Sequence, residues 1–141
     1  MHKILIVDDD DVLRGMLATF LQQQGYQCTL AENVAKACGH LSKKNFQLTI
    51  SDFNMPSESG LDLLRYVKSR SHATSFILMS AETNEELRNE ALELGAAACI
   101  AKPFKLQELL RIVEDALYQG ISSLQMHQEL RGHLCSSNYS I

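Results

Sequence analysis

The sequence has no hydrophobic run long enough to span a membrane and no excess of positive charge. Its apolar runs fall far short of the ~20 residues that a membrane-spanning helix requires, which argues against an integral membrane protein. Because 17 Asp+Glu outnumber 13 Lys+Arg, the net charge of −4 argues against general binding to nucleic acids or anionic membranes. Residues 1–11 pass from a short apolar run straight into acids, unlike a signal peptide, so we expect a cytoplasmic chain.

The sequence also lacks paired cysteines and clustered histidines. The four cysteines form no C-x-x-C pair; they are Cys28, Cys38, Cys99 and Cys135. In a reducing compartment such isolated cysteines are typical small hydrophobic residues rather than metal ligands or disulfide partners. The five histidines are too scattered for a metal site on one helical face.

The composition of the chain is that of an ordinary globular protein. With 141 residues, 45% of them hydrophobic and 21% charged, it is long enough for one domain with a substantial core. Residues 120–141 contain several serines and only scattered apolar positions, so we interpret residues 1–119 as the domain and the remainder as a tail. A helix in this tail would offer a surface for a homodimer, an arrangement that Gly120 and Gly132 disfavour.

Short apolar runs alternate with helical patterns along the domain. Strands are expected at 4–7, 48–50 and 76–79, with weaker candidates at 26–31 and 97–101. Apolar residues recur at helical spacing within 13–21, 34–41, 61–69, 87–94 and 106–117. A strand followed by a helix, repeated five times, predicts an α/β fold with a doubly wound, five-stranded parallel sheet and helices on both faces.

Residues that end helices support this division. Gly25, Gly95 and Gly120 each follow a helical pattern, at the position where a left-handed residue is favoured. Residues 83–86 (Thr-Asn-Glu-Glu) fit a capping box that opens the fourth helix.

Polar residues interrupt the chain at the ends of the predicted strands. Residues 8–11 are all aspartates after the first strand, Asp52 follows the third, Ser80 the fourth and Lys102 the fifth. Ligands of parallel α/β sheets bind beyond the carboxyl ends of the strands, so these side chains are expected to share one site. Taken singly, each has a structural explanation: an acid of the first cluster caps the next helix, and Ser80 lies in a turn.

Such a set of side chains suits phosphoryl chemistry. Neighbouring carboxylates repel one another unless a cation compensates, and an all-oxygen ligand set favours Mg²⁺. Lys102 adds a fixed positive charge and Ser80 a hydroxyl. A carboxylate in this setting can act as a nucleophile and form an aspartyl phosphate.

Four segments together resemble the receiver domain of two-component response regulators, of the single-domain chemotaxis type. They are Ile-Leu-Ile-Val-Asp-Asp-Asp (4–10), Ser-Asp-Phe-Asn-Met-Pro (51–56) with Ser-Gly (59–60), Met-Ser-Ala-Glu (79–82) and Lys-Pro-Phe (102–104). Order and spacing both match, and the resemblance covers roughly residues 2–119. It implies a flavodoxin-like fold with strand order 2-1-3-4-5.

The resemblance also implies roles for individual residues. Asp52 would accept a phosphoryl group from a sensor histidine kinase or a phosphotransfer protein. The Mg²⁺ ligands would be Asp8, Asp9, the carboxylate of Asp52 and the backbone carbonyl of Asn54. Lys102, in a bond to Pro103 that is usually cis, would pair with phosphoryl oxygens. Such a domain catalyses only its own phosphorylation and dephosphorylation and is not otherwise an enzyme.

Ser80 would connect the phosphoryl group to the output. Its hydroxyl would bind another phosphoryl oxygen and shift the face formed by the fourth helix, fifth strand and fifth helix, which would control a partner or a separate output domain. Asn54 and Glu82 resemble the pair found in short-lived receivers, which implies decay within seconds to minutes. Cys99 departs from the family, which usually has an aromatic side chain at that position to follow the hydroxyl.

Two other functions are weighed against the receiver. A haloacid-dehalogenase-type phosphatase would use Asp8 and Asp10, but it needs an acidic pair after the lysine and gives Asp52 no role. A receiver-fold adaptor would work through protein contacts without phosphorylation, although every active-site residue type is retained. The kinase, the downstream partner and any output domain are not specified by the sequence.

Overall fold

The computed structural model describes residues 2–70, 73–82 and 84–118. The strands of this α/β protein are β1 (Lys3–Val7), β2 (Gln27–Ala31), β3 (Leu48–Asp52), β4 (Ser75–Ser80) and β5 (Ala98–Ala101). The helices are α1 (Asp11–Gln23), α2 (Val34–Lys43), α3 (Gly60–Ser69), α4 (Glu85–Glu93) and α5 (Leu106–Leu117). The predicted alternation of strands and helices is therefore confirmed. Thr83, Gly120 and the tail lie outside the described residues.

The five strands form one parallel sheet in the order β2-β1-β3-β4-β5, as predicted. The strand β1 lies between β2 and β3, so the chain reverses its direction of progress across the sheet at this point. Loops that leave the carboxyl ends of β1 and β3 therefore turn to opposite faces, and a crevice opens between them.

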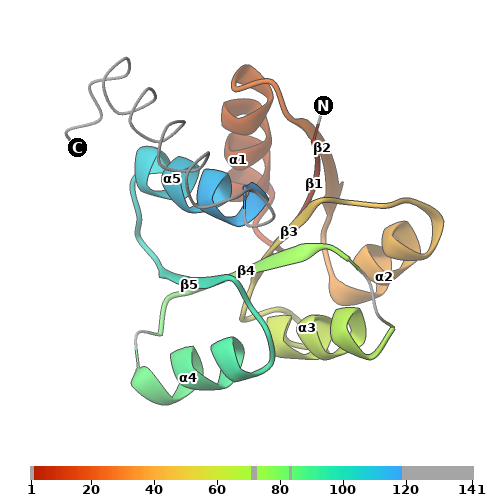
Figure 1. The fold of residues 1–141 in the computed structure, drawn as a ribbon, viewed down its shortest axis with the longest axis vertical. Coiled ribbons are helices and arrows are strands. Elements are labelled where there is room, and N and C mark those ends of the chain that lie inside the picture. The colour runs from red at the N-terminus through yellow and green to blue at the C-terminus, as the bar shows by residue number, and fades with distance from the viewer. Residues whose placement is uncertain (1, 71–72, 83, 119–141) are drawn as a thin grey trace.

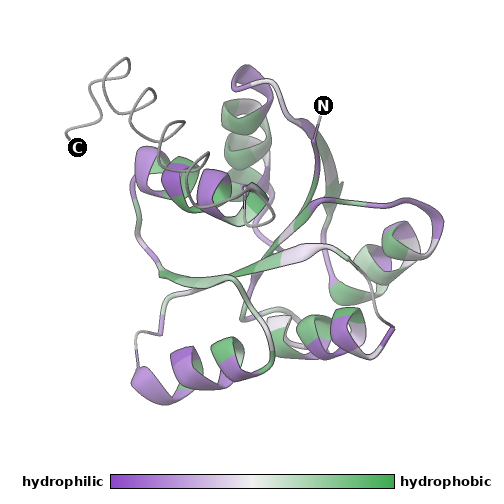
Figure 2. Cartoon of the chain, in the orientation of Figure 1, coloured by the Kyte–Doolittle hydropathy of each residue, from purple (hydrophilic) through white to green (hydrophobic). Residues whose placement is uncertain are grey.

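Helices cover both faces of the sheet (Figure 1): α1 and α5 lie on one face, and α2, α3 and α4 on the other. Successive residues of a strand point to opposite faces, so Ile4 and Ile6 pack with α1 and α5, while Leu5 and Val7 pack with α2 and α3. Figure 2 shows the same division on the helices, which turn apolar residues to the sheet and polar residues outward. Two apolar cores thus hold the sheet rigid from either side.

The strength of each strand's sequence signal follows from its place in the sheet. The central strands β3 and β4 are buried almost throughout, as is β1 after its first residue. The sequences of β1 and β4 are accordingly nearly continuous apolar runs, whereas β3 also buries the small polar residues Thr49 and Ser51. The outer strands β2 and β5 are partly exposed and carry mixed sequences, which explains why they were the weaker candidates.

Helix ends agree with the sequence in two places and differ in one. Gly25 and Gly95 have φ of 96° and 105°, the left-handed conformation expected of residues that end helices. The capping box predicted at 83–86 is wrong, because α4 begins at Glu85 and its N-cap is Asn84, which accepts a hydrogen bond from the Leu87 amide. A complete capping box is found at the start of α3 instead.

In the part of the chain that the structure describes, no helix is both long and apolar enough to cross a bilayer.

Candidate functional site

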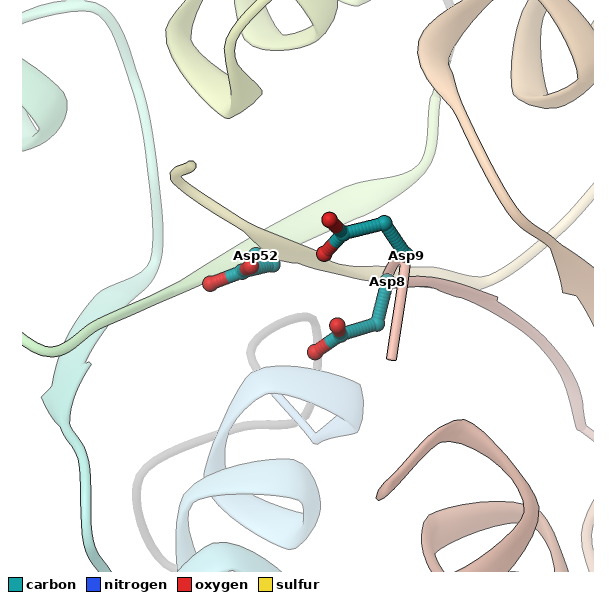
Figure 3. A group of neighbouring side chains, drawn as sticks. All are labelled: Asp8, Asp9 and Asp52. Atoms are coloured by element: carbon teal, nitrogen blue, oxygen red, sulfur yellow. The ribbon is translucent and has the colours of Figure 1, made fainter. Parts of the chain in front are cut away.

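Three carboxylates converge at the carboxyl edge of the sheet. Asp8 and Asp9 follow β1 and Asp52 ends β3, and one oxygen from each lies within 4.8 Å of the others. Figure 3 shows the three side chains gathered at the ends of the two strands. Asp8 is fully buried and Asp52 is 7% exposed, whereas Asp9 is open to solvent. The predicted cluster of acids from two strand ends is therefore present in the fold.

Lys102 joins this cluster from the end of the sheet's last strand. Its Nζ lies 3.0 Å from Oδ1 of Asp52 and 3.2 Å from Oδ2 of Asp8. The backbone amide of Lys102 donates to the Ser80 carbonyl at 2.8 Å, and the peptide bond to Pro103 is cis, as the resemblance implied. One ammonium thus bridges the carboxylates that come from two different strands.

The environment shifts two pKa values in the cluster. Burial raises the pKa of Asp52, and the charges of Asp8 and Asp9 raise it further, while Lys102 opposes the shift without cancelling it. Burial alone would lower the pKa of Lys102, but Asp52 and Asp8 together raise it above its ordinary value. Lys102 is consequently a permanent cation, and the cluster as a whole has a surplus of negative charge.

The loop from β1 to α1 is fixed by its own hydrogen bonds. The Asp10 amide donates to Oδ1 of Asp8 at 2.9 Å, and the Asp10 carboxylate accepts from the amides of Val12 and Leu13 as the N-cap of α1. Arg14 donates from Nη1 to the carbonyl of Asp8 at 2.6 Å, a contact that sequence reasoning missed. Asp10 is therefore a capping residue and lies outside the carboxylate cluster.

Asp52 is held by tight packing of its backbone. The Ser51 hydroxyl donates to the Asp52 carbonyl at 3.0 Å, and the Phe53 amide donates to the Met79 carbonyl at 2.7 Å. A Cβ on Gly60 would come within 2.4 Å of the Asp52 carbonyl oxygen, so the first residue of α3 has to be glycine. Gly60 of the predicted Ser-Gly motif therefore packs directly against the end of β3.

The other predicted residues lie around this centre. Ser80 is buried, and its hydroxyl accepts a hydrogen bond from the Glu82 amide at 3.0 Å, which is the turn role weighed for it. Asn54 is exposed, two residues after Asp52 in the loop before α3. Cys99 is half-buried and lines a hollow of about 370 Å³ between α4 and β5, beside Arg88. Among the described residues that line this hollow, none is aromatic.

The donor set suits a hard divalent cation. It consists only of oxygen ligands, and two of its three carboxylates are buried. The single positive charge of Lys102 does not balance the negative charge of these carboxylates. Mg²⁺ favours such sites because it binds through a few carboxylates and keeps several waters, for which the exposed Asp9 side leaves access. The residues present therefore fit a magnesium ion.

A doubly wound parallel sheet with an acidic centre at its switch point defines the flavodoxin-like class of α/β proteins. The chain belongs to the response regulator receiver domain family, whose model matches residues 4–114. It is 40% identical over 107 residues to the protein PetR of Rhodobacter capsulatus. This alignment covers 76% of this chain and 45% of PetR. Identity to the regulatory protein AtoC of Escherichia coli is 37% over 117 residues, 83% of this chain and 25% of that one.

Solved structures give the same result for the fold. The chemotaxis response regulator CheY4 of Vibrio cholerae superposes with a TM-score of 0.78 at 32% identity, covering 83% of this chain and 99% of that one. TrrA of Thermotoga maritima, solved in complex with Mg²⁺ and BeF, gives a TM-score of 0.75 at 30% identity, with 83% and 100% covered. The chain spans a quarter to about half the length of the curated relatives it matches.

Proposed function

We propose that Asp52 is the phosphoacceptor of this receiver domain and that the transfer depends on Mg²⁺ held by Asp8, Asp9 and Asp52. The donor is a phosphohistidine on a sensor histidine kinase or a phosphotransfer protein. The observation that carries the proposal is the convergence of three carboxylates within 4.8 Å, with the Lys102 ammonium 3.0 Å from Asp52. The Mg²⁺ and BeF bound by TrrA support the same chemistry.

The transfer is a displacement at phosphorus. A carboxylate oxygen of Asp52 forms the new P–O bond while the P–N bond to the donor imidazole breaks, and the imidazole nitrogen leaves with the electron pair. When bound, Mg²⁺ supplies the positive charge that balances the phosphoryl oxygens against the carboxylates. Asp8, Asp9, Asp52 and the backbone carbonyl of Asn54 would hold this ion, and Lys102 would pair with a phosphoryl oxygen.

Ser80 couples the phosphoryl group to the surface formed by α4, β5 and α5. Its hydroxyl accepts a hydrogen bond from the Glu82 amide at 3.0 Å, and its own hydrogen can donate to a phosphoryl oxygen, so a shift of Ser80 toward that oxygen would draw in the loop after β4. The loop leads into α4, and the face of α4, β5 and α5 would change with it. Because Cys99 replaces the usual aromatic residue, movement of the loop and helix carries this change alone.

Two further features extend the proposal. The free thiols of Cys28, Cys38 and Cys99 fit the reducing cytoplasm, where we place the protein. The small polar side chain of Asn54 and the exposed Glu82 leave room for an attacking water, so we expect the phosphorylated state to decay within seconds to minutes. Residues 1–119 form the receiver domain, which acts on a protein partner or an output domain.

Intact-protein mass after incubation with acetyl phosphate and Mg²⁺ tests the proposal. Wild type should gain one phosphoryl group, as should Asp115→Asn, in which an exposed acid of α5 is changed. Asp52→Asn and a sample without Mg²⁺ should gain none. An unmodified wild type would contradict the proposal and favour the adaptor that works without phosphorylation. An unmodified wild type that steadily releases phosphate would instead favour the phosphatase.

A further inference from the structure

Arg14 reaches back from α1 to the acidic loop. Its Nη1 donates to the backbone carbonyl of Asp8 at 2.6 Å, and its Nη2 pairs with the carboxylate of Asp11. Only 15% of the Arg14 side chain is exposed, although the side chain belongs to a helix on the protein surface. A long cation that is largely buried and aimed at a backbone carbonyl is ordered by these contacts rather than free in solvent.

Among the hydrogen bonds that the structure describes for Asp8, only the one at its carbonyl comes from a residue of α1. The Asp8 amide already donates to Ala31 at 3.2 Å, and its two carboxylate oxygens are engaged by the Asp10 amide and by Lys102. The carbonyl belongs to the planar peptide unit that joins Asp8 to Asp9, so the orientation of this unit determines the position of the Asp9 Cα, from which the side chain extends. With Arg14 in place, this peptide unit is tethered to the first turn of a rigid helix.

The geometry points to Arg14 as a positioning residue for the metal centre. We infer that it fixes the peptide unit between Asp8 and Asp9 so that both carboxylates face Asp52 before the cation binds. The inference rests on the proposed function, since it assigns Arg14 a part in Mg²⁺ affinity. Residues that orient metal ligands without touching the metal typically change affinity about 10–100-fold when they are replaced.

A purely electrostatic role for Arg14 predicts the opposite sign. Its positive charge lies beside an acidic cluster, so removing that charge should strengthen the attraction for a cation. If Arg14 positions the loop, its removal weakens Mg²⁺ binding despite the gain in negative charge. Arg14→Lys further separates the positioning role from the electrostatic role, because it keeps the positive charge. A single ammonium cannot replace the planar guanidinium, which bonds both the Asp8 carbonyl and the Asp11 carboxylate.

Calorimetric titration with Mg²⁺ tests this inference on the full chain. We expect Arg14→Lys and Arg14→Ala to bind about tenfold more weakly than wild type. The matched control is Arg65→Lys, whose guanidinium joins Asp62 and Glu90 on the exposed side of α3, and it should bind as wild type does. Equal affinity in Arg14→Lys, or tighter binding in Arg14→Ala, would overturn the role of Arg14.

Amide hydrogen exchange gives a readout that does not depend on the metal. Without Mg²⁺, the Asp10 amide, which donates to Asp8, should exchange faster in Arg14→Lys than in wild type, while amides of β3 stay unchanged. Uniformly faster exchange would instead indicate general destabilisation and contradict a positioning role. Failure of wild type itself to bind Mg²⁺ would count against the proposed function. It would leave standing the positioning of the Asp8 peptide by Arg14, which the exchange of the Asp10 amide measures.

Discussion

Gly60 lies directly against the backbone of Asp52. A Cβ at Gly60 would approach the Asp52 carbonyl oxygen to 2.4 Å and a methyl carbon of Leu78 to 2.7 Å, both closer than atoms pack in proteins. The Gly60 amide also donates to the Phe53 carbonyl at 2.8 Å. The start of α3 and the end of β3 are therefore one packed unit, and the position of Asp52 depends on a residue with no side chain.

Replacing Gly60 should accordingly destabilise the fold. We expect Gly60→Ala to lower the free energy of unfolding by about 1–3 kcal/mol, because the opposing atom is backbone and cannot rotate away. Gly39→Ala is the control: Gly39 lies within α2 with nothing within 4 Å of an added Cβ, so alanine should raise stability by roughly 0.5–1 kcal/mol. Urea unfolding measures both, and effects of the same sign would contradict the packing argument.

The raised pKa of Asp52 means that the ionised carboxylate destabilises the folded state relative to the unfolded state. A carboxyl with a raised pKa stabilises the fold while protonated, below its unfolded value of about 3.9, and loses that contribution as the pH rises through its folded pKa. Without Mg²⁺, Asp52→Asn should therefore be more stable than wild type near neutral pH. The difference should shrink as the pH falls from about 7.5 to about 4.5.

Unfolding curves in EDTA across this pH range check the sign. A stability difference between Asp52→Asn and wild type that stays constant, or grows on acidification, would show that burial does not raise the pKa of Asp52. Saturating Mg²⁺ should narrow or reverse the difference, since the cation stabilises only a protein that retains the carboxylate.

Lys102 contributes by its shape as well as its charge. Its ammonium bridges Asp8 and Asp52 at 3.2 and 3.0 Å, and a wider planar guanidinium cannot occupy that point. Lys102→Arg should slow phosphoryl uptake from acetyl phosphate roughly tenfold or more, measured by intact mass over time. Lys105→Arg, at an exposed position whose side chain makes no cap hydrogen bond, should react at the rate of wild type. Equal rates in both variants would show that charge alone suffices.

The described cysteines should be poorly reactive in the native protein. Burial raises the pKa of Cys28 to about 11 and also raises the pKa values of Cys38 and Cys99. At about pH 8 the thiolate of Cys28 should be on the order of a hundredfold scarcer than that of an exposed thiol. Alkylation by iodoacetamide, followed by peptide mass, should be much slower before unfolding in urea than after it; equal rates would contradict this environment.

Much of the fold could be predicted because burial leaves a direct mark on the sequence. Strands covered on both faces, such as β1 and β4, are apolar along most of their length, and a polar residue marks the point where each one ends. Asp52 and Ser80 stand at such ends, and the parallel topology brings them to the same edge. That rule alone places the candidate site at this edge of the sheet.

Other features depend on contacts that spacing does not encode. The sequence left open which acid after β1 caps α1, and only the loop conformation assigns that role to Asp10. The tether from Arg14 to Asp8 spans six residues and carries no sequence signal beyond an arginine three positions after Asp11. Ser57 has a φ of 74°, a conformation that glycine usually adopts, so the loop before α3 was not foreseeable from its turn residues.

The most direct test of the account is to locate the phosphoryl group. After reaction with acetyl phosphate and Mg²⁺, borohydride reduces an aspartyl phosphate to homoserine, and peptide mass identifies the changed residue. The account predicts homoserine at position 52 alone, with none in a sample that lacks Mg²⁺. Homoserine at Asp8 or Asp9, or a stable phosphoryl group that leaves Asp52 unchanged, would contradict it.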